Sequence, residues 1–360
     1  MPTRVPINWS TRKRSRGSKH LVRHSVLLLS DLPHAELADL ARWVENRGFD
    51  GIWYADERFY HEPYVGLAAI AMSTEKIFLG PGVTDPKSRH PGLTASAINS
   101  INEMSGGRAL LGIGAGKSGF HNLGLTTARS AVGIKEAVVA IRRLLEGERV
   151  TLDGEVVYLD DAGMRVDSEP VPICVAANGP LTLRTAGEVA DIVMIPHCRS
   201  LDLLAHKMRS VEEGVERAGR DSMPEVILRL DTSVDEDGAA AEHMAKTRLG
   251  RTLWAAYPRI PFLEALDIPL PEELDRRLHD AGPFQYTFDL TAFERFADAI
   301  PDEILAAVCL AGTPSQVAEQ VAVLESAGVN EVNIHPVPPP GKVQENVMDL
   351  YAAAVMSRPD

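Results

Sequence analysis

The sequence is poor in cysteine and has no long apolar run. Its 360 residues include only three cysteines, at positions 174, 198 and 309, and no two of them form a C-x-x-C pair. Such a sparse, odd set excludes a disulfide framework and predicts small buried apolar thiols in a reducing compartment, so a cytoplasmic location is expected. No run of eighteen apolar residues occurs, which argues against a transmembrane helix and a membrane partner.

Acidic side chains are absent from the first 24 residues, which carry seven lysines and arginines. The apolar stretch that follows, SVLLLSD, is too short for the core of a secretory signal. We therefore predict that residues 1–24 form a solvated, mobile basic arm. An arm that contacts an anion, a partner subunit or nucleic acid is the alternative. The net charge of −13 argues against broad nucleic-acid binding by the whole chain.

The glycine-rich stretch LLGIGAGKSGF, at 110–120, lacks the spacing of the common phosphate-binding motifs. A P-loop needs glycine five residues before its Gly-Lys pair, where this chain has Leu111. The dinucleotide pattern G-x-G-x-x-G fails because its last spacing is one residue short. Taken alone, the stretch predicts a strand with a glycine-rich exit.

A repeating order of helix, glycine and short apolar strand predicts the fold. Candidate strands lie at 25–29, 51–55, 76–83, 108–113, 172–176, 191–195, 225–231 and 330–335. Helical periodicity lies between nearly all of them, at 35–47, 64–73, 93–104, 130–146, 180–189, 201–218 and 314–327. Eight strand–helix units favour an α/β fold of the (β/α)₈ TIM-barrel type over an open sheet.

Two segments interrupt the repeat. Residues 148–170 alternate in polarity around Asp153-Gly154, which predicts an inserted hairpin. Residues 233–312 contain six prolines, which predicts several short helices over the barrel mouth. We expect a single barrel domain over 25–360, with both insertions and with its chemistry at the carboxyl ends of the strands.

The strand ends resemble those of the luciferase-like flavin and deazaflavin oxidoreductases. The phrases that carry the resemblance are R-H-P, S-G-G-R and L-G-I-G-A-G, in that order, followed by the strand and turn PVPICVAANGP. The resemblance runs from about Ser25 to the last strand. The G-V-T after the third strand and the A-N-G-P turn are most similar to the branch that uses coenzyme F420, a deazaflavin. The resemblance implies a luciferase-like barrel that transfers a hydride between F420 and an organic substrate.

The resemblance also implies a set of cofactor-binding residues. A non-proline cis peptide at Gly82-Val83 would support the back of the ring, and free N–H groups at the helix start after Gly179 would suit a phosphate. The implied cofactor contacts are Asp56, Gly82, Val83, Thr84, Gly114, Ala115, Gly116, Ala176, Ala177, Asn178, Gly179 and Pro180. In this interpretation Gly114 and Gly116 clear space for the cofactor, because glycine lets backbone approach a ligand closely.

Three residues are the candidates for catalysis. Asp56 matches a family aspartate near the reactive end of the cofactor, and Glu57 follows it, so repulsion between the pair would raise one pKa. Lys117 stands where relatives carry an acid, and a lysine of ordinary pKa can only donate a proton near neutral pH. It would otherwise hold an anion or point into water. The proton-transfer step is therefore open.

The remaining polar strand ends point to no metal. His197 and His335 follow strands, but no two histidines have metal-ligand spacing with a carboxylate. His90, before Pro91, is expected to begin the third helix. The rival functions are an FMN-dependent luciferase-like monooxygenase and a non-catalytic F420 or flavin binder. A small-molecule substrate and, from the family, a homodimer are expected.

Overall fold

The barrel is closed by eight parallel strands. The structure, a computed structural model, describes residues 22–357 except 286 and 288. The strands follow the order β3-β2-β1-β11-β9-β8-β7-β4, and parallel bridges Leu79–Ala109 and Thr84–Ile113 join β3 to the β4 segment. Their bounds are β1 (Arg23–Leu28), β2 (Gly51–Tyr54), β3 (Phe78–Pro81), β4 (Leu111–Ile113), β7 (Ile173–Ala176), β8 (Ile192–Pro196), β9 (Glu225–Val234) and β11 (Glu331–Pro336). The predicted (β/α)₈ barrel is confirmed.

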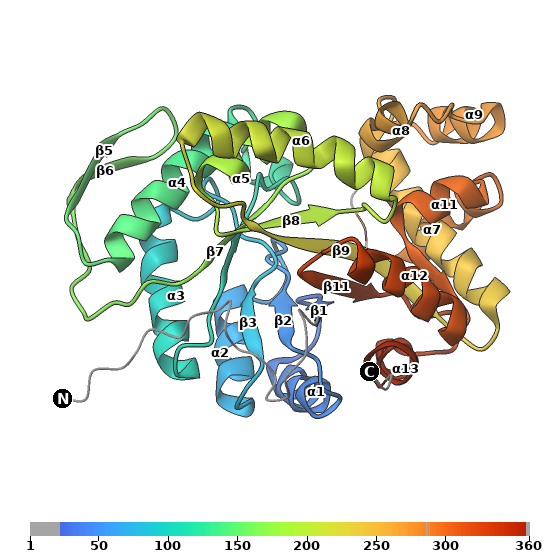
Figure 1. Cartoon of the computed structure of the whole chain (residues 1–360), viewed down its shortest axis with the longest axis horizontal. Helices are drawn as coiled ribbons and strands as arrows, with labels where there is room; N and C mark the ends of the chain where they lie inside the picture. Colours follow the sequence, from blue (N-terminus) through green and yellow to red (C-terminus); the bar gives the residue numbers. More distant parts are fainter. Residues whose placement is uncertain (1–21, 286, 288, 358–360) are drawn as a thin grey trace.

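The helices surround this barrel (Figure 1). They are α1 (His34–Asn46), α2 (Pro63–Ser73), α3 (Pro91–Ser105), α4 (Ser130–Leu145), α5 (Pro180–Val189), α6 (Leu201–Ala218) and α12 (Pro314–Ser326), each within two residues of its predicted range. His90 is the N-cap of α3, as expected, because its Nδ1 accepts the Gly92 N–H at 3.1 Å.

Apolar side chains fill both faces of the strands, as a parallel sheet requires. One cluster lies inside the barrel and includes Leu27, Trp53, Phe78, Met194 and Ile227. The larger cluster joins the outer faces of the strands to the helices, where α1, for example, buries Leu37, Leu40, Ala41 and Val44 at helical spacing. The packed interior leaves only the barrel ends for chemistry.

The first insertion is an antiparallel hairpin of β5 (Val150–Asp153) and β6 (Tyr158–Ala162), which lies outside the barrel beside α4 (Figure 1). Glu136 of α4 accepts backbone N–H groups of residues 155–157 at 2.8–2.9 Å. His90 Nε2 lies 3.1 Å from the Tyr158 carbonyl oxygen. The hairpin therefore braces α3 and α4 and adds no residue to the strand ends.

The second insertion holds α7 (Gly238–Ala256), α8 (Pro261–Leu266), α9 (Glu272–Asp280), η3 (Leu290–Phe293), α10 (Glu294–Ala297) and α11 (Asp302–Val308). The predicted boundary at 233 is wrong, because β9 continues to Val234 and pairs there with a ninth strand, β10 (Leu310–Gly312). A three-residue strand is too short to show periodicity in sequence. After β11 the chain forms α13 (Gln344–Tyr351) and one turn of π-helix, η4 (Ala352–Met356).

The predicted basic arm falls almost wholly outside the described residues. Its last two members do not belong to an arm, because Arg23 and His24 begin β1. Arg23 forms ion pairs with Glu225 and Glu331, which anchors the strand at the amino end of the barrel. None of the helices between residues 22 and 357 that the structure describes is long and apolar enough to cross a membrane.

Candidate functional site

The predicted cofactor residues lie at the carboxyl ends of four strands, β2, β3, β4 and β7. Between β3 and β4 the backbone is tied by Thr84 N–H to the Gly112 oxygen at 3.0 Å and Gly114 N–H to the Thr84 oxygen at 2.8 Å. The peptide bond between Gly82 and Val83 is cis, as the resemblance implied. The structure therefore brings these residues together in one arc of the barrel mouth.

Asp56, at the end of β2, carries a carboxyl with a raised pKa. Burial causes the rise, and the neighbouring Arg58 guanidinium opposes it. Arg58 is itself engaged, because it forms an ion pair with the buried Asp85 and donates to the Asp56 carbonyl oxygen at 2.7 Å. The predicted cause of the shift, repulsion by Glu57, is wrong, since the carboxylate that adds to the rise is Glu62.

Glu57 and Lys117 both form hydrogen bonds with other groups of the protein. The Ser118 hydroxyl donates to the Glu57 carboxylate, which joins the β2 loop to the β4 loop. Lys117 is exposed, and its Nζ donates to the carbonyl oxygen of Ala255 in α7 at 3.1 Å. The lysine thus spans from the β4 loop to the second insertion.

The glycines of this arc meet protein atoms where a Cβ would be. A Cβ on Gly82 would lie 2.9 Å from Leu27 Cδ1 and Trp53 Cβ, and one on Gly114 would lie 2.8 Å from Val83 Cγ2. Gly116 has φ of +65°, and a Cβ there would lie 2.2 Å from the Phe120 ring. Close packing of the strand ends and a left-handed backbone therefore require these glycines, in addition to any approach of a ligand.

The helix that follows β7 has an open amino end. Gly179 is the N-cap of α5 and supplies no side-chain acceptor, and a Cβ there would meet nothing within 4 Å. The buried Lys207 ammonium of α6 donates to the Asn178 side-chain oxygen, so a cation stands beside these N–H groups. Free N–H groups with a neighbouring cation suit an anion such as a phosphate.

The opposite side of the barrel mouth holds a buried ionic cluster centred on Asp231 of β9. The Asp231 carboxylate lies 2.8 Å from His335 Nδ1, 3.3 Å from Arg229 Nη2 and 3.8 Å from Arg248 Nη2. The two guanidinium groups hold the pKa of Asp231 well below its ordinary value although burial alone would raise it. Burial lowers the pKa of His197 to about 3 and that of His335 to about 4.

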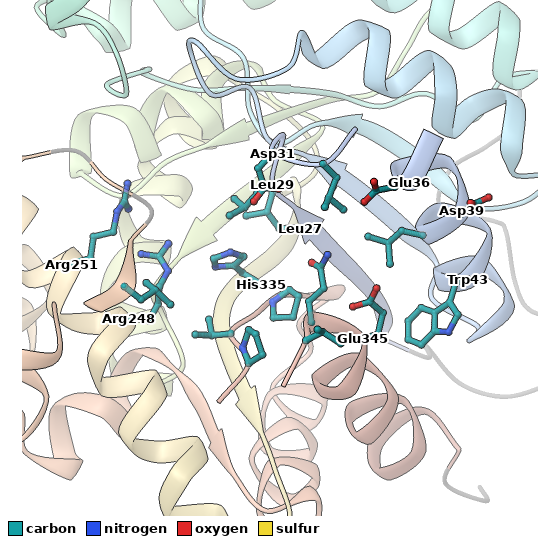
Figure 2. Close-up of a pocket in the computed structure, with 18 residues that line it drawn as sticks. Leu27, Leu29, Asp31, Glu36, Asp39, Trp43, Arg248, Arg251, His335 and Glu345 are labelled. Atoms are coloured by element: carbon teal, nitrogen blue, oxygen red, sulfur yellow. The ribbon is translucent and has the colours of Figure 1, made fainter. Parts of the chain in front are cut away.

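A cavity of about 740 Å³ opens beside this cluster, between the ends of β1 and β11, α1 and the start of α13 (Figure 2). Its walls include Leu27, Leu29, Arg248, Arg251 and His335. None of the predicted cofactor residues lines it. The two regions nevertheless adjoin, because the Leu27 side chain packs against Gly82. A cavity of this size can enclose a small organic ligand.

Sequence reasoning placed His335 at a strand end but did not join it to Asp231, and it missed Arg229, Arg248 and Lys207. The missed residues lie inside a strand or on helices, where motif matching gives no signal. Arg248 stands in an otherwise helical, partly apolar run, MAKTRLGRTLW, so a charge on the buried face was the available clue. Among the described residues, no group of three metal-ligating side chains is arranged to hold a metal ion.

Comparison with known proteins yields a family and close relatives. The model of the family "Luciferase-like monooxygenase" matches residues 16–331. The 5,10-methylenetetrahydromethanopterin reductase of Archaeoglobus fulgidus is 32% identical over 314 residues, which cover 86% of this chain and 92% of the relative. The F420-dependent glucose-6-phosphate dehydrogenase of Intrasporangium calvum is 27% identical over 374 residues, covering 98% of each protein.

A solved structure supports the same grouping. The coenzyme F420-dependent tetrahydromethanopterin reductase from Methanopyrus kandleri superposes with a TM-score of 0.80 at 28% sequence identity. The match covers 93% of this chain and 98% of the other. The likeness therefore extends over the barrel and over both insertions.

Proposed function

Because this chain belongs to the luciferase-like monooxygenase family, we propose that it is an oxidoreductase that binds coenzyme F420 and transfers a hydride to or from an organic substrate. The observation that carries the proposal is the similarity, over nearly the whole length, to methylenetetrahydromethanopterin reductases. The family model alone would favour neither FMN nor F420 as the cofactor. The relatives named for F420 favour the deazaflavin.

The residues present fit such a coenzyme at two points. The open amino end of α5, with Asn178, Gly179 and Lys207, suits its phosphodiester, and the Gly82-Val83 turn with Thr84 and Gly114 forms the adjoining backbone wall. When bound, F420 supplies or accepts the hydride. The remaining proposed contacts are Asp56, Val83, Ala115, Gly116, Ala176, Ala177 and Pro180.

In this proposal a side chain of the protein donates or accepts the proton that accompanies hydride transfer. Asp56 is the best placed acid, because burial raises the pKa of its carboxyl and so keeps a proton on it nearer neutral pH. Glu57 and Lys117 are engaged by Ser118 and Ala255, and we assign them the supporting role of joining the loops over the site. The closely packed barrel interior beneath the site, with the apolar side chains of Leu27, Trp53 and Phe78, excludes water from below.

Titration of the purified chain with F420 and with FMN, followed by absorbance and fluorescence, tests the proposal. We expect a dissociation constant in the low micromolar range or below for F420 and binding at least tenfold weaker for FMN. Tighter binding of FMN would favour the monooxygenase alternative. Tight F420 binding without turnover over a wide substrate panel would favour a non-catalytic binder.

An Asn178→Asp variant sharpens the test. The change keeps the shape of the side chain but adds a negative charge beside the amino end of α5, which repels a phosphate while favouring the helix. We expect F420 affinity to fall about tenfold or more with no loss of stability. Thr313→Asp, at the N-cap of α12, is the matched control and should leave F420 affinity unchanged.

We also propose a homodimer in the cytoplasm. Val65 and Met72, seven residues apart on α2, and Leu93 on the neighbouring α3 are large, exposed apolar side chains. Such a patch is typical of a protein interface. Sedimentation of the wild type and of a Met72→Glu variant tests this, since a charge in the interface should shift the mass toward the monomer.

A further inference from the structure

The cavity beside β1 and β11 has one cationic end. Arg248 and Arg251, one turn apart on α7, line it together with His335 of β11. In Figure 2 the two arginines lie on one side of the cavity, Glu36, Asp39 and Glu345 lie on the other, and Leu27, Leu29 and Asp31 lie between them. The cavity is therefore polarised along its length.

The buried cluster behind this end carries a surplus positive charge. Two guanidinium groups, Arg229 and Arg248, face the single carboxylate of Asp231, at 3.3 Å and 3.8 Å. His335 and His197 add no charge near neutral pH, because burial lowers their pKa values to about 4 and about 3. Within the described residues the cluster is thus left with one net positive charge.

Arg248 presents that charge to the cavity. Its exposed fraction is only 7%, and its Nη1 is buried with no hydrogen-bond partner among the described residues. Its Nη2 is 3.8 Å from Asp231, beyond a normal hydrogen bond. A buried charged donor without an acceptor is costly, and an anionic ligand group in the cavity would satisfy it.

The rest of the cavity defines the body of the ligand. Leu27, Leu29, Pro336 and Val337 give the cavity apolar walls. The carboxylates at the far end would repel a second anionic group, so the ligand should carry its negative charge at one end only.

We propose that this cavity binds an organic anion, with its carboxylate or phosphate on Arg248 and Arg251 and its apolar body against Leu27 and Leu29. The structure assigns this site to the substrate, which rests on the proposed function, because Leu27 adjoins Gly82 of the proposed coenzyme site. The acidic groups of the coenzyme itself are the other source of such an anion, and the experiment separates the two.

The test uses the full chain, with and without F420, titrated calorimetrically with benzoate, phenyl phosphate and the neutral benzamide. We expect each anion to bind at least tenfold tighter than benzamide, and to bind with F420 present. Arg248→Gln should weaken benzoate about 10- to 100-fold, as expected for loss of a charged hydrogen bond, and Arg248→Lys should recover part of it. Arg259→Gln, an exposed arginine outside this cavity, is the control.

Arg251→Gln keeps the test decisive if Arg248→Gln does not fold, because Arg251 lies at the half-buried edge. It should weaken benzoate about threefold to tenfold. Equal affinities for benzoate and benzamide, or binding only above about 10 mM, would overturn the site. Competition between benzoate and F420, with F420 affinity lost in the Arg248 variants, would overturn the substrate assignment in favour of the coenzyme. Arg248-dependent benzoate binding without any F420 binding would keep the anion site and reject the coenzyme.

Discussion

The two sides of the barrel mouth each hold an aspartate near a strand end, and the pKa values of the two carboxyl groups are shifted in opposite directions. Asp56, beside β2, has a raised pKa because burial outweighs the Arg58 charge. Asp231, in β9, has a pKa held well below its ordinary value because Arg229 and Arg248 both face it. The comparison teaches that the balance between burial and charged partners, and not position in the barrel, decides which way the pKa of a buried carboxyl shifts.

Removing the charge of each carboxylate should give the largest difference in stability between the two sides of the barrel mouth. Asp231→Asn leaves two buried guanidinium groups without an acid and should lower the free energy of unfolding by about 3–5 kcal/mol. Asp56→Asn removes a carboxylate that burial already disfavours, and should change it by less than about 1 kcal/mol or raise it. Urea unfolding of both variants measures the difference. Similar losses in the two would contradict the assignment of opposite environments.

The pH dependence of the free energy of unfolding should come from His197 and His335, the two histidines beside Asp231 of β9. The folded pKa of His197, about 3, lies below its ordinary value of 6.5, so between these values the unfolded chain binds a proton that the folded chain does not. Stability should therefore fall as the pH falls below about 6.5, by roughly 1.4 kcal/mol per pH unit for this histidine. His335 acts with the same sign down to about pH 4.

A His197→Asn variant isolates this contribution, because asparagine tolerates the left-handed φ of +51° at that position. Unfolding measured at several pH values between 7 and 5 should show a slope smaller by about 1.4 kcal/mol per unit than in the wild type. An unchanged slope would mean that His197 is protonated in the fold. Asp56 acts with the opposite sign, since its raised pKa lets the folded chain take up a proton first.

Substitution of two glycines tests whether the end of β4 is tightly packed against neighbouring protein atoms. Gly114→Ala places a Cβ 2.8 Å from Val83 Cγ2 and should cost about 1 kcal/mol of stability, since the neighbour must shift. Gly179→Ala meets open space and should change stability by less than about 0.5 kcal/mol. Thermal unfolding of the pair measures this contrast. A neutral Gly114→Ala with lost F420 binding would instead show that the glycine is needed only for the ligand.

The barrel could be predicted from sequence because helix periodicity and glycine stops are local signals, and seven helices lie within two residues of their predicted ranges. The arc of site residues at the ends of β2, β3, β4 and β7 could be predicted because the motifs that carry the family resemblance lie there. The Asp231 cluster could not be predicted, because it joins side chains up to 138 residues apart by fold alone: His197 from β8, Arg229 from β9, Arg248 from α7 and His335 from β11. Arg248 also lies in an insertion that no motif marks.

The smallest effect is expected for Lys117, the exposed counterpart of the buried Lys207. In the described structure its side chain donates one hydrogen bond, to the Ala255 carbonyl oxygen at 3.1 Å, so Lys117→Ala should change the free energy of unfolding by less than about 0.5 kcal/mol. The affinity for F420 should stay within twofold of the wild type, because the Lys117 side chain is exposed and donates to Ala255 of α7. Lys117→Arg, which keeps the charge, is the control. Lost turnover in the alanine variant alone, with unchanged affinity, would show that Lys117 donates the proton and that Asp56 does not.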